Sequence, residues 1–378
     1  MRKSFWLTLW LICLPLLAIA ADSSFFWDQQ RTGANWFNNS PTKQWLIDAK
    51  AAGIEFVRLA PAKWWTSQSD FLVGDADCYQ GIPEYDMEKL DQVFHWADSL
   101  DMKIVLTMLS LPGLRWKQQN GDRLDHRLWE NPIYQPRAAL YWKHVAEAFG
   151  GHPCLVGYNI LNEPVPERAP EFAKAEFQSY DEWYQTVKDT TADLNKFYQL
   201  ATKKIREVDS TTPIILDCGS WAGPAAMSYL EPVDDSLVLY SFHMYEPWDF
   251  VSRTNDRRYT YPDDYTPDTL RSILAPVVKW QKEHGIPSNR VLVGEFGCYR
   301  QNPGAAQWLA DAITLFDEQG WHWAFYSFRE DDWPGMDYEL GTKPLGEAYW
   351  KAKANGEIPE ANRSDNPLWH VISNGLNK

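Results

Sequence analysis

Two glutamates in this sequence each follow a short aliphatic run, and together they could do acid–base chemistry. Glu163 ends the segment LVGYNILNE and stands between Asn162 and Pro164, while Glu295 ends the segment RVLVGE. An aliphatic run that stops at a polar side chain is typical of a buried strand whose end reaches a surface. Two carboxylates on one surface can cleave a glycosidic bond, because one protonates the leaving oxygen while the other attacks the sugar or activates water. For Asn162 and Glu163 alone, the start of a capped helix is an equally good interpretation.

The elements that must bring the two glutamates together are short apolar strands alternating with helices. We predict strands at residues 33–37, 54–60, 103–109, 155–161, 214–216, 237–242, 291–296 and 323–328. We predict helices at residues 41–52, 85–100, 136–149, 192–208, 224–229, 266–284 and 304–319. Apolar strands alternating with helices are typical of a parallel sheet that is covered on both faces.

The connections between these elements favour a closed barrel over an open sheet. No Gly-x-Gly-x-x-Gly turn follows the first strand, as it would in a dinucleotide-binding sheet. The connections after the strands are long (61–84, 110–136, 165–191, 246–265 and 329–343), whereas the returns from helix to strand are short. The sequence therefore predicts an α/β fold, a (β/α)8 TIM barrel whose long βα loops form an open cleft.

Other polar residues at predicted strand ends could support the two carboxylates. Arg58 ends the second strand, where its guanidinium could keep a carboxylate ionised; a purely structural ion pair is the alternative. Asn162 could bond a sugar hydroxyl beside the reaction centre. His243 and Tyr245 end the sixth strand, where they could orient the carboxylates. A single histidine is more often structural than catalytic, so His243 is a candidate by its position only.

Four segments, in this order, resemble glycoside hydrolase family five, the cellulase family of the large clan of retaining barrels. They are Val57-Arg58, Leu161-Asn162-Glu163-Pro164, His243-Met244-Tyr245 and Gly294-Glu295-Phe296-Gly297. The resemblance extends from residue 33 to about residue 349. It implies a retaining mechanism with Glu163 as general acid/base and Glu295 as the nucleophile that forms a covalent glycosyl-enzyme. It also implies that no cofactor and no catalytic metal is needed.

Two positions depart from the pattern of that family. Members usually carry a histidine at the end of the third strand, where this sequence has Leu109, and His126 in the next loop is the nearest replacement along the chain. Members usually carry a tryptophan near the end of the eighth strand, where this sequence has Tyr326, followed by Trp333 in the loop. We therefore expect Tyr326 and Trp333 to contribute to substrate binding. The departures concern the sugar subsites and leave the carboxylate pair intact.

Residues 1–20 have the features of a signal peptide. Arg2 and Lys3 precede an apolar run that is broken by Pro15, and the run ends in Ala18-Ile19-Ala20, a small-x-small cleavage pattern. The run is short for a membrane span. We expect residues 21–378 to form a single catalytic barrel domain that is secreted, extracellular or periplasmic, with no membrane contact after cleavage. The four cysteines that remain are too few for a disulfide framework.

The composition restricts the ligands that this protein could bind. The formal net charge is −15 and becomes −17 when Arg2 and Lys3 leave with the signal peptide, which argues against nucleic acid as a partner. The 21 tryptophans can fill a large core, or stack on sugar faces where they line a cleft. We expect a polysaccharide or oligosaccharide substrate and a monomeric protein.

The sequence thus predicts a secreted retaining glycoside hydrolase that cleaves β-linked glucan, with an endo-β-1,4-glucanase as the first expectation. A β-mannanase or a β-1,3-glucanase of the same family is the alternative. A non-catalytic carbohydrate-binding barrel is the alternative from another class. Whether water or a sugar hydroxyl resolves the intermediate stays open at this point.

Overall fold

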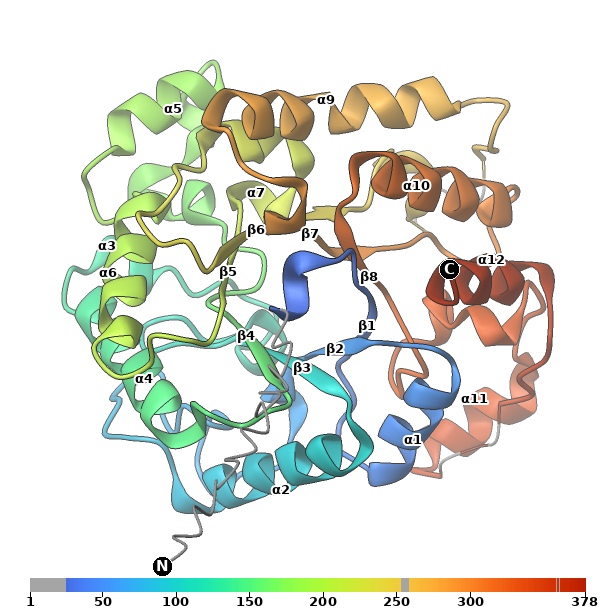
Figure 1. Cartoon of the computed structure of the whole chain (residues 1–378), viewed down its shortest axis with the longest axis horizontal. Coiled ribbons are helices and arrows are strands. Elements are labelled where there is room, and N and C mark those ends of the chain that lie inside the picture. Colours follow the sequence, from blue (N-terminus) through green and yellow to red (C-terminus); the bar gives the residue numbers. More distant parts are fainter. Residues whose placement is uncertain (1–24, 253–257, 358, 360) are drawn as a thin grey trace, which may run out of the picture.

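Eight parallel strands form a closed barrel in chain order (Figure 1). The computed structural model describes residues 25–252, 258–357, 359 and 361–378. The strands are β1 (Thr32–Trp36), β2 (Phe56–Leu59), β3 (Lys103–Thr107), β4 (Leu155–Asn159), β5 (Ile214–Asp217), β6 (Val238–Met244), β7 (Val291–Phe296) and β8 (His322–Phe325). Each strand pairs with the next, and β8 pairs with β1, so the predicted barrel is confirmed. The signal peptide predicted at residues 1–20 lies outside the described residues.

Helices surround the barrel. They are α1 (Lys43–Ala51), α2 (Glu84–Leu100), α3 (Arg127–Glu130), α4 (Tyr134–Phe149), α5 (Tyr180–Val187), α6 (Leu194–Arg206), α7 (Gly219–Ala222), α8 (Trp248–Val251), α9 (Pro267–His284), α10 (Ala305–Gln319), α11 (Gly346–Ala354) and α12 (Pro367–Leu376). Of these, α1, α2, α4, α6, α9 and α10 lie where helices were predicted. Side-chain caps fix several boundaries, because Thr42, Asp193 and Thr266 accept backbone N–H groups of the turns that follow them. The segment predicted as a helix at residues 224–229 is a 3₁₀ helix.

The sequence analysis did not predict the short helices α3, α7 and α8, nor α5, α11 and α12. In α5 only Trp183 and Val187 are buried, one turn apart, so its apolar pattern is too short to distinguish it from a loop. Ser179 nevertheless caps it by accepting from the N–H of Glu182. In α11 no residue is buried at all, and its amphipathic signal is correspondingly weak.

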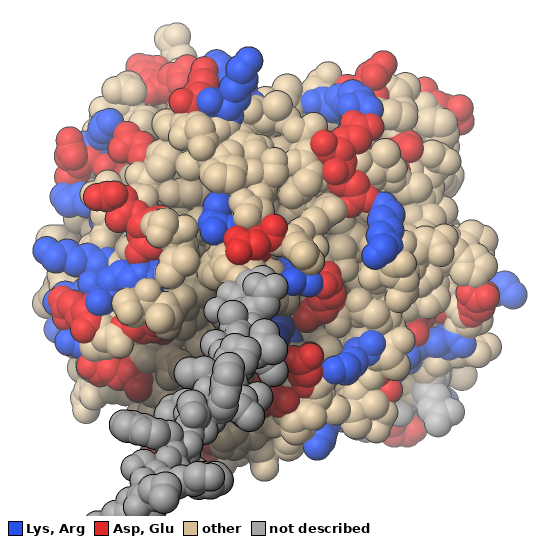
Figure 2. Space-filling view, viewed as in Figure 1, with Lys and Arg blue, Asp and Glu red and all other residues tan. Residues whose placement is uncertain are grey.

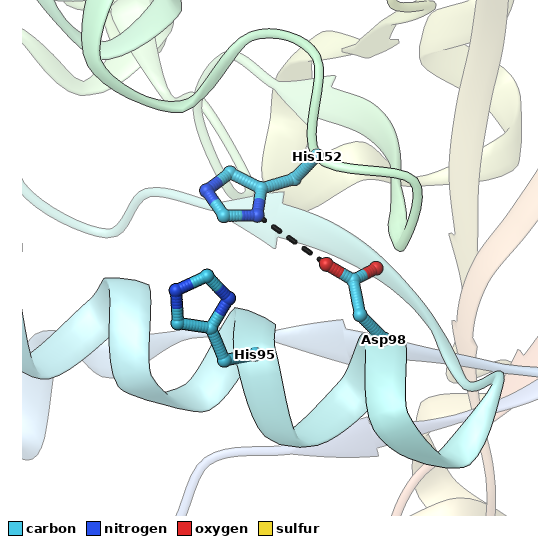
Figure 3. A group of neighbouring side chains, drawn as sticks. All are labelled: His95, Asp98 and His152. Atoms are coloured by element: carbon cyan, nitrogen blue, oxygen red, sulfur yellow. Dashed lines mark hydrogen bonds and ion pairs between the residues drawn. The ribbon is translucent and has the colours of Figure 1, made fainter.

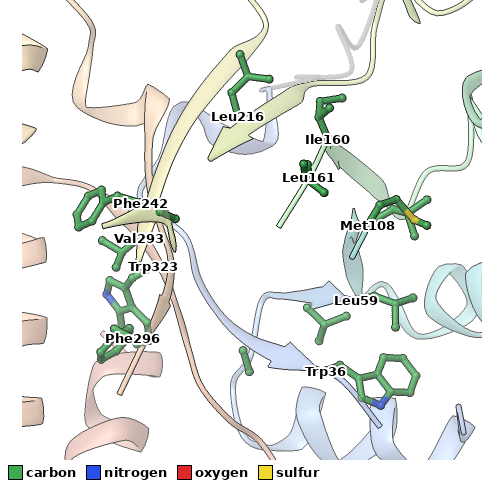
Figure 4. Close-up of a cluster of buried hydrophobic side chains, with 14 of the residues drawn as sticks. Trp36, Leu59, Met108, Ile160, Leu161, Leu216, Phe242, Val293, Phe296 and Trp323 are labelled. Atoms are coloured by element: carbon green, nitrogen blue, oxygen red, sulfur yellow. The ribbon is translucent and has the colours of Figure 1, made fainter. Parts of the chain in front are cut away.

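Strand residues alternate between the barrel interior and the surrounding helices. Outward residues such as Trp36, Leu59, Leu216 and Phe242 join the main hydrophobic cluster with the helices (Figure 4). The inward residues near the amino ends of the strands form a second apolar cluster: Phe56, Val105, Val156, Ile215, Leu239, Leu292 and Ala324. Further along the same strands the inward positions become polar, as at Arg58, Thr107, Asn159, Asp217 and His243, all of which are buried.

The amino-terminal end of the barrel is closed by a short 3₁₀ helix, η1 (Phe26–Asp28). Its Trp27 is fully buried, packs in the inner apolar cluster and donates from Nε1 to the carbonyl oxygen of Val156 at 2.8 Å. Figure 1 shows this dark-blue segment over the centre of the barrel. Because apolar residues fill this end, the inward polar residues are left to the end where the strands finish, which is where barrels of this kind carry their active sites.

The surface seen from this side carries both charges. Figure 2 shows lysine and arginine side chains interspersed with aspartate and glutamate rather than gathered in one basic area. Among the described helices, none combines the length and the apolar character that crossing a membrane requires. Cys78, Cys154, Cys218 and Cys298 are all free thiols, and only Cys78 is exposed.

Candidate active site

Arg58 is the charged centre of the polar layer inside the barrel. Its side chain is fully buried, and Nη1 donates to Glu295 Oε1 at 2.5 Å and to Asn35 Oδ1 at 3.1 Å. Its Nη2 donates to Asp217 Oδ2 at 3.2 Å. Strand β2 places Arg58 there because Phe56, two residues earlier, occupies the inner apolar cluster and side chains alternate along a strand. A buried guanidinium needs such partners, since leaving its charge unpaired would cost several kcal/mol.

Two asparagines complete the hydrogen bonding of the guanidinium. Asn159 Oδ1 accepts from Arg58 Nε at 3.0 Å and from Nη2 at 2.7 Å, and Asn162 Oδ1 accepts from Nη2 at 2.7 Å. Asn159 Nδ2 donates in turn to Asp217 Oδ1 at 3.0 Å. With its amide oxygen turned to Arg58, Asn162 keeps its amide N–H groups for another acceptor, such as a sugar hydroxyl.

Glu295, at the end of β7, is held by a cation and a phenol. Besides the bond from Arg58, its Oε2 accepts from the Tyr245 hydroxyl at 2.8 Å. The residue is 4% exposed, and burial raises the pKa of its carboxyl. Arg58 and the Tyr245 hydroxyl oppose that rise in pKa, because each of them stabilises the ionised form.

Glu163 occupies a different environment, without a cation at hydrogen-bonding distance among the described residues. Its Oε1 lies 2.9 Å from His243 Nδ1, and its backbone N–H donates to Asp217 Oδ2 at 3.3 Å. Burial raises the pKa of its carboxyl to about 8; the charge of Asp217 adds to that rise, and Arg58 opposes it. The backbone of Glu163 has a φ of 48°, in the left-handed region that costs a non-glycine residue roughly 1–3 kcal/mol. The bond to Asp217 holds this conformation.

The two glutamates therefore lie close together in different environments: Glu295 accepts from Arg58 and Tyr245, whereas Glu163 contacts His243. One oxygen of each, and a ring nitrogen of His243, all lie within 4.8 Å of one another. Such a group can hold a cation, but the adjacent Arg58 guanidinium disfavours one. Two carboxylates this close share protons as a coupled pair, and the environment of Arg58 and Tyr245 favours the negative charge on Glu295.

His243 connects the two glutamates to Asp217. Its side chain is 1% exposed, and its Nε2 lies 3.4 Å from Asp217 Oδ2. Burial lowers the pKa of His243, so the imidazole is neutral near pH 7 and carries one N–H. A shift of the pairing register between Phe242 and His243 places His243 beside Glu295 in the neighbouring strand.

The residues at the two positions that depart from the family pattern lie side by side. Leu109 is 5% exposed and packs with Phe37 and Tyr326 in a small apolar cluster. The Tyr326 ring is 6.5 Å from the Tyr245 ring, and its hydroxyl donates to Glu330. The Tyr326 ring thus lies beside that of Tyr245, and its part in substrate binding stays a prediction.

His126 and Trp333 lie in other surroundings. His126 is half-buried, and its charged neighbours are Glu130, Asp125 and Arg168. Trp333, in the loop after β8, has its ring 6.5 Å from that of Tyr299. The part of Trp333 in substrate binding stays a prediction.

Sequence reasoning missed three members of the site, Asn35, Asn159 and Asp217. Each is fully buried and each hydrogen-bonds Arg58. Their signal in the sequence is a polar residue near the carboxyl end of an apolar strand, as in the run Ile-Ile-Leu-Asp that ends at Asp217. The predicted fifth strand stopped one residue too early to include it.

The family comparison covers most of the chain. A family model described as Cellulase (glycosyl hydrolase family 5) matches residues 19–332. Endoglucanase C of Acetivibrio thermocellus is 22% identical over 339 residues, which cover 80% of this chain and 87% of that protein.

Solved structures share the fold. Thermotoga maritima Cel5A in complex with cellobiose superimposes with a TM-score of 0.63 at 17% identity, over 90% of this chain and 97% of that one. The same protein in complex with a mannotriose substrate gives the same TM-score, identity and coverage. At this identity the likeness shows the barrel and no more.

Proposed function

Because the chain belongs to the cellulase family, glycosyl hydrolase family 5, and is a glycoside hydrolase, we propose that it cleaves β-linked glucan by a retaining double displacement. The observation that carries this proposal is the pair Glu163 and Glu295, with oxygens within 4.8 Å of each other. Retaining enzymes keep their carboxyl groups roughly 5–5.5 Å apart, whereas inverting enzymes leave about 6.5–9.5 Å for a water molecule.

In the first step Glu295 attacks the anomeric carbon while Glu163 protonates the leaving oxygen. Arg58 and Tyr245 keep Glu295 ionised, as a nucleophile must be. Glu163, with its pKa raised to about 8, carries a proton at neutral pH. The products of this step are a glycosyl ester on Glu295 and the released sugar alcohol.

In the second step Glu163 acts as the base. Esterification removes the negative charge of Glu295, which lies within 4.8 Å of Glu163, and so removes a repulsion that kept Glu163 protonated. The pKa of Glu163 falls, and its carboxylate takes a proton from the water that attacks the ester carbon. This cleavage releases the sugar and restores the proton on Glu163.

His243 positions the proton of Glu163 in both steps. When Glu163 is protonated, its O–H can donate to Nδ1, and the single ring N–H is then on Nε2, 3.4 Å from Asp217 Oδ2. When Glu163 is ionised, the other tautomer donates from Nδ1 to its carboxylate. The neutral imidazole thus serves both protonation states without adding a charge that would lower the pKa of Glu163 too far.

We assign the substrate as a β-1,4-glucan attacked within the chain, since relatives matched over 80% of this chain are named endoglucanase. β-Mannan is the first alternative, because a solved neighbour is described with a mannotriose substrate. A β-1,3-glucan is the second, because a relative from Wickerhamomyces anomalus, matched over 32% of this chain, is named glucan 1,3-beta-glucosidase 2.

A substrate panel tests this assignment. Carboxymethyl cellulose, mixed-linkage glucan, mannan and β-1,3-glucan are incubated with the enzyme, and release of reducing sugar is measured against Glu295→Gln as an inactive control. We expect the fastest release from the β-1,4-linked glucans, with a rapid fall in viscosity that indicates endo action. Preferential release from mannan would overturn the glucan assignment, and release from none would support a binding barrel.

We further propose that the protein is exported after cleavage behind Ala20 and acts as a monomer. The basic residues, the apolar run and the small-x-small pattern of residues 1–20 support export. N-terminal sequencing of the protein from its host should begin at Ala21. Light scattering of that material should give the mass of one chain.

A further inference from the structure

A second group of titratable side chains lies at the opposite end of the barrel from the catalytic pair. His95 and Asp98 come from the last turns of α2, and His152 comes from the short loop between α4 and β4 (Figure 3). The helix α2 leads into β3, and this loop leads into β4, so the group lies at the amino ends of the strands. Glu163 and Glu295 lie at the carboxyl ends.

The group consists of two imidazoles and two carboxylates. One ligand atom from each of His95, Asp98 and His152 lies within 4.8 Å of the others. Asp91, one turn before His95, adds a carboxylate that lies 3.2 Å from His95 Nε2 and 3.0 Å from His152 Nε2. Residues four and three positions apart share one face of a helix, so α2 presents its three members toward His152 together.

His152 has a carboxylate at each of its ring nitrogens. Nε2 lies 3.0 Å from Asp91 Oδ1, and Nδ1 lies 3.4 Å from Asp98 Oδ2. A neutral imidazole carries one N–H, so one lone pair of a neutral His152 would face a carboxylate oxygen. Either a second proton or a shared cation removes that conflict. The ring is also held in place, since it packs edge-on against Phe94 with centroids 5.2 Å apart.

We propose that His95, His152 and Asp98 bind a divalent transition cation such as Zn²⁺, with Asp91 as a further carboxylate beside the two imidazoles. Imidazole nitrogens together with carboxylate oxygens suit zinc, whereas magnesium and calcium prefer oxygen ligands alone. The side chains must draw together to reach bond lengths of about 2.0–2.2 Å, which the exposure of His95 (68%) and Asp91 (43%) permits.

The bound cation would join α2 to the loop that enters β4. These two segments are already linked by the contacts of His152 with Phe94, Asp91 and Asp98, and by Cys154 Sγ, which donates to the carbonyl oxygen of Phe94. Because Glu163 lies at the far end of β4, the cation stabilises the fold and takes no part in hydrolysis. This inference is independent of the proposed reaction.

The test uses untagged, chelator-treated enzyme, with Zn²⁺ titrated by calorimetry and thermal unfolding followed with and without the metal. We expect one site per chain, and a Tm that rises by roughly 3–5 °C when free Zn²⁺ is a hundredfold above its Kd. His152→Ala and His95→Ala should both lose the site and the Tm shift. Mg²⁺ should neither bind at this site nor raise the Tm.

Two controls separate this site from other zinc binding. His370→Ala removes an exposed histidine that pairs with one aspartate only, Asp365, and it should keep both the site and the shift. Zinc bound at Glu163, His243 and Glu295 would inhibit hydrolysis and would survive His152→Ala. No saturable binding, or binding that His95→Ala and His152→Ala leave unchanged, overturns the proposal.

Discussion

Arg58 and Glu295, 237 residues apart in sequence, meet inside the barrel with Nη1 at 2.5 Å from Oε1. The bond joins the end of β2 to the end of β7 across the barrel interior. The Arg58 guanidinium also donates to Oδ1 of Asn162, the residue before Glu163. The buried Arg58 guanidinium thereby links β2 to β7 and to the segment after β4. It also stabilises the negative charge of Glu295 more directly than that of Glu163.

Replacing Arg58 with lysine keeps the charge and removes the forked geometry. A lysine ammonium cannot reach Asn35, Asn159, Asp217 and Glu295 at once, so buried acceptors lose their donors. We expect Arg58→Lys to lower the free energy of unfolding by roughly 2–5 kcal/mol in denaturant titrations and to reduce kcat strongly. Arg271→Lys is the control, because Arg271 pairs with Glu318 at the protein surface. Equal losses in the two variants would contradict the central role of Arg58.

Removing the Tyr245 hydroxyl should weaken the nucleophile. Tyr245→Phe takes away a donor to Glu295, and that donor lowers the pKa of the carboxyl. We expect kcat/KM to fall about 10- to 100-fold, as for a lost hydrogen bond to a charged group, and the acidic limb of its pH profile to move to higher pH. Tyr261→Phe is the control, since its hydroxyl donates to a carboxylate, Asp311, outside the site. An unmoved acidic limb in Tyr245→Phe would argue against this role.

The raised pKa of Glu163 predicts how stability changes with pH. Folding raises this pKa from 4.5 to about 8, so the folded state binds the proton more tightly than the unfolded chain does. This contribution to stability is complete below about pH 4.5 and is lost as the pH rises to about 8. Glu163→Gln cannot ionise, so its Tm relative to wild type should increase between pH 5 and pH 8. A difference in Tm that does not vary with pH would show that Glu163 titrates near its ordinary value.

Asp217 should affect the pH at which kcat/KM declines on the alkaline side of its profile. Its charge raises the pKa of Glu163, after burial, and its Oδ2 accepts the backbone N–H of Glu163. In Asp217→Asn, kcat/KM should decline at lower pH than in wild type, where the decline is expected near pH 8. Asp209→Asn is the control for general destabilisation, because Asp209 is a buried carboxylate that bonds Tyr158 and Thr212 instead. If the alkaline limb of kcat/KM moved equally in both variants, the shift would reflect general destabilisation and not the charge of Asp217.

The barrel and the carboxylate pair could be predicted from the sequence because their signals are local. Eight apolar runs are separated by helical patterns, and Glu163 and Glu295 each close such a run. Arg58, His243 and Tyr245 were found in the same way, at strand ends. The contacts among them depend on which side of a strand a residue faces.

The remaining members of the site depend on register and packing. Asn35 and Asp217 matter because they face inward, which only the closed sheet determines. The bulge before His243 sets its approach to Glu295, and no local pattern marks it. The positive φ of Glu163 is likewise a result of its surroundings, since a glutamate before a proline has no preference for that conformation.

The central claim is that Glu295 becomes covalently bound to the sugar while Glu163 supplies and removes the proton. A 2-deoxy-2-fluoro glycoside with a good leaving group slows the second step and allows the intermediate to accumulate. After incubation with such a cellobioside, peptide mass mapping should find one fluorosugar per chain on the peptide that contains Glu295, and none in Glu295→Gln. A label on the peptide that contains Glu163, or turnover of ordinary substrate with inversion and no label, would contradict the account.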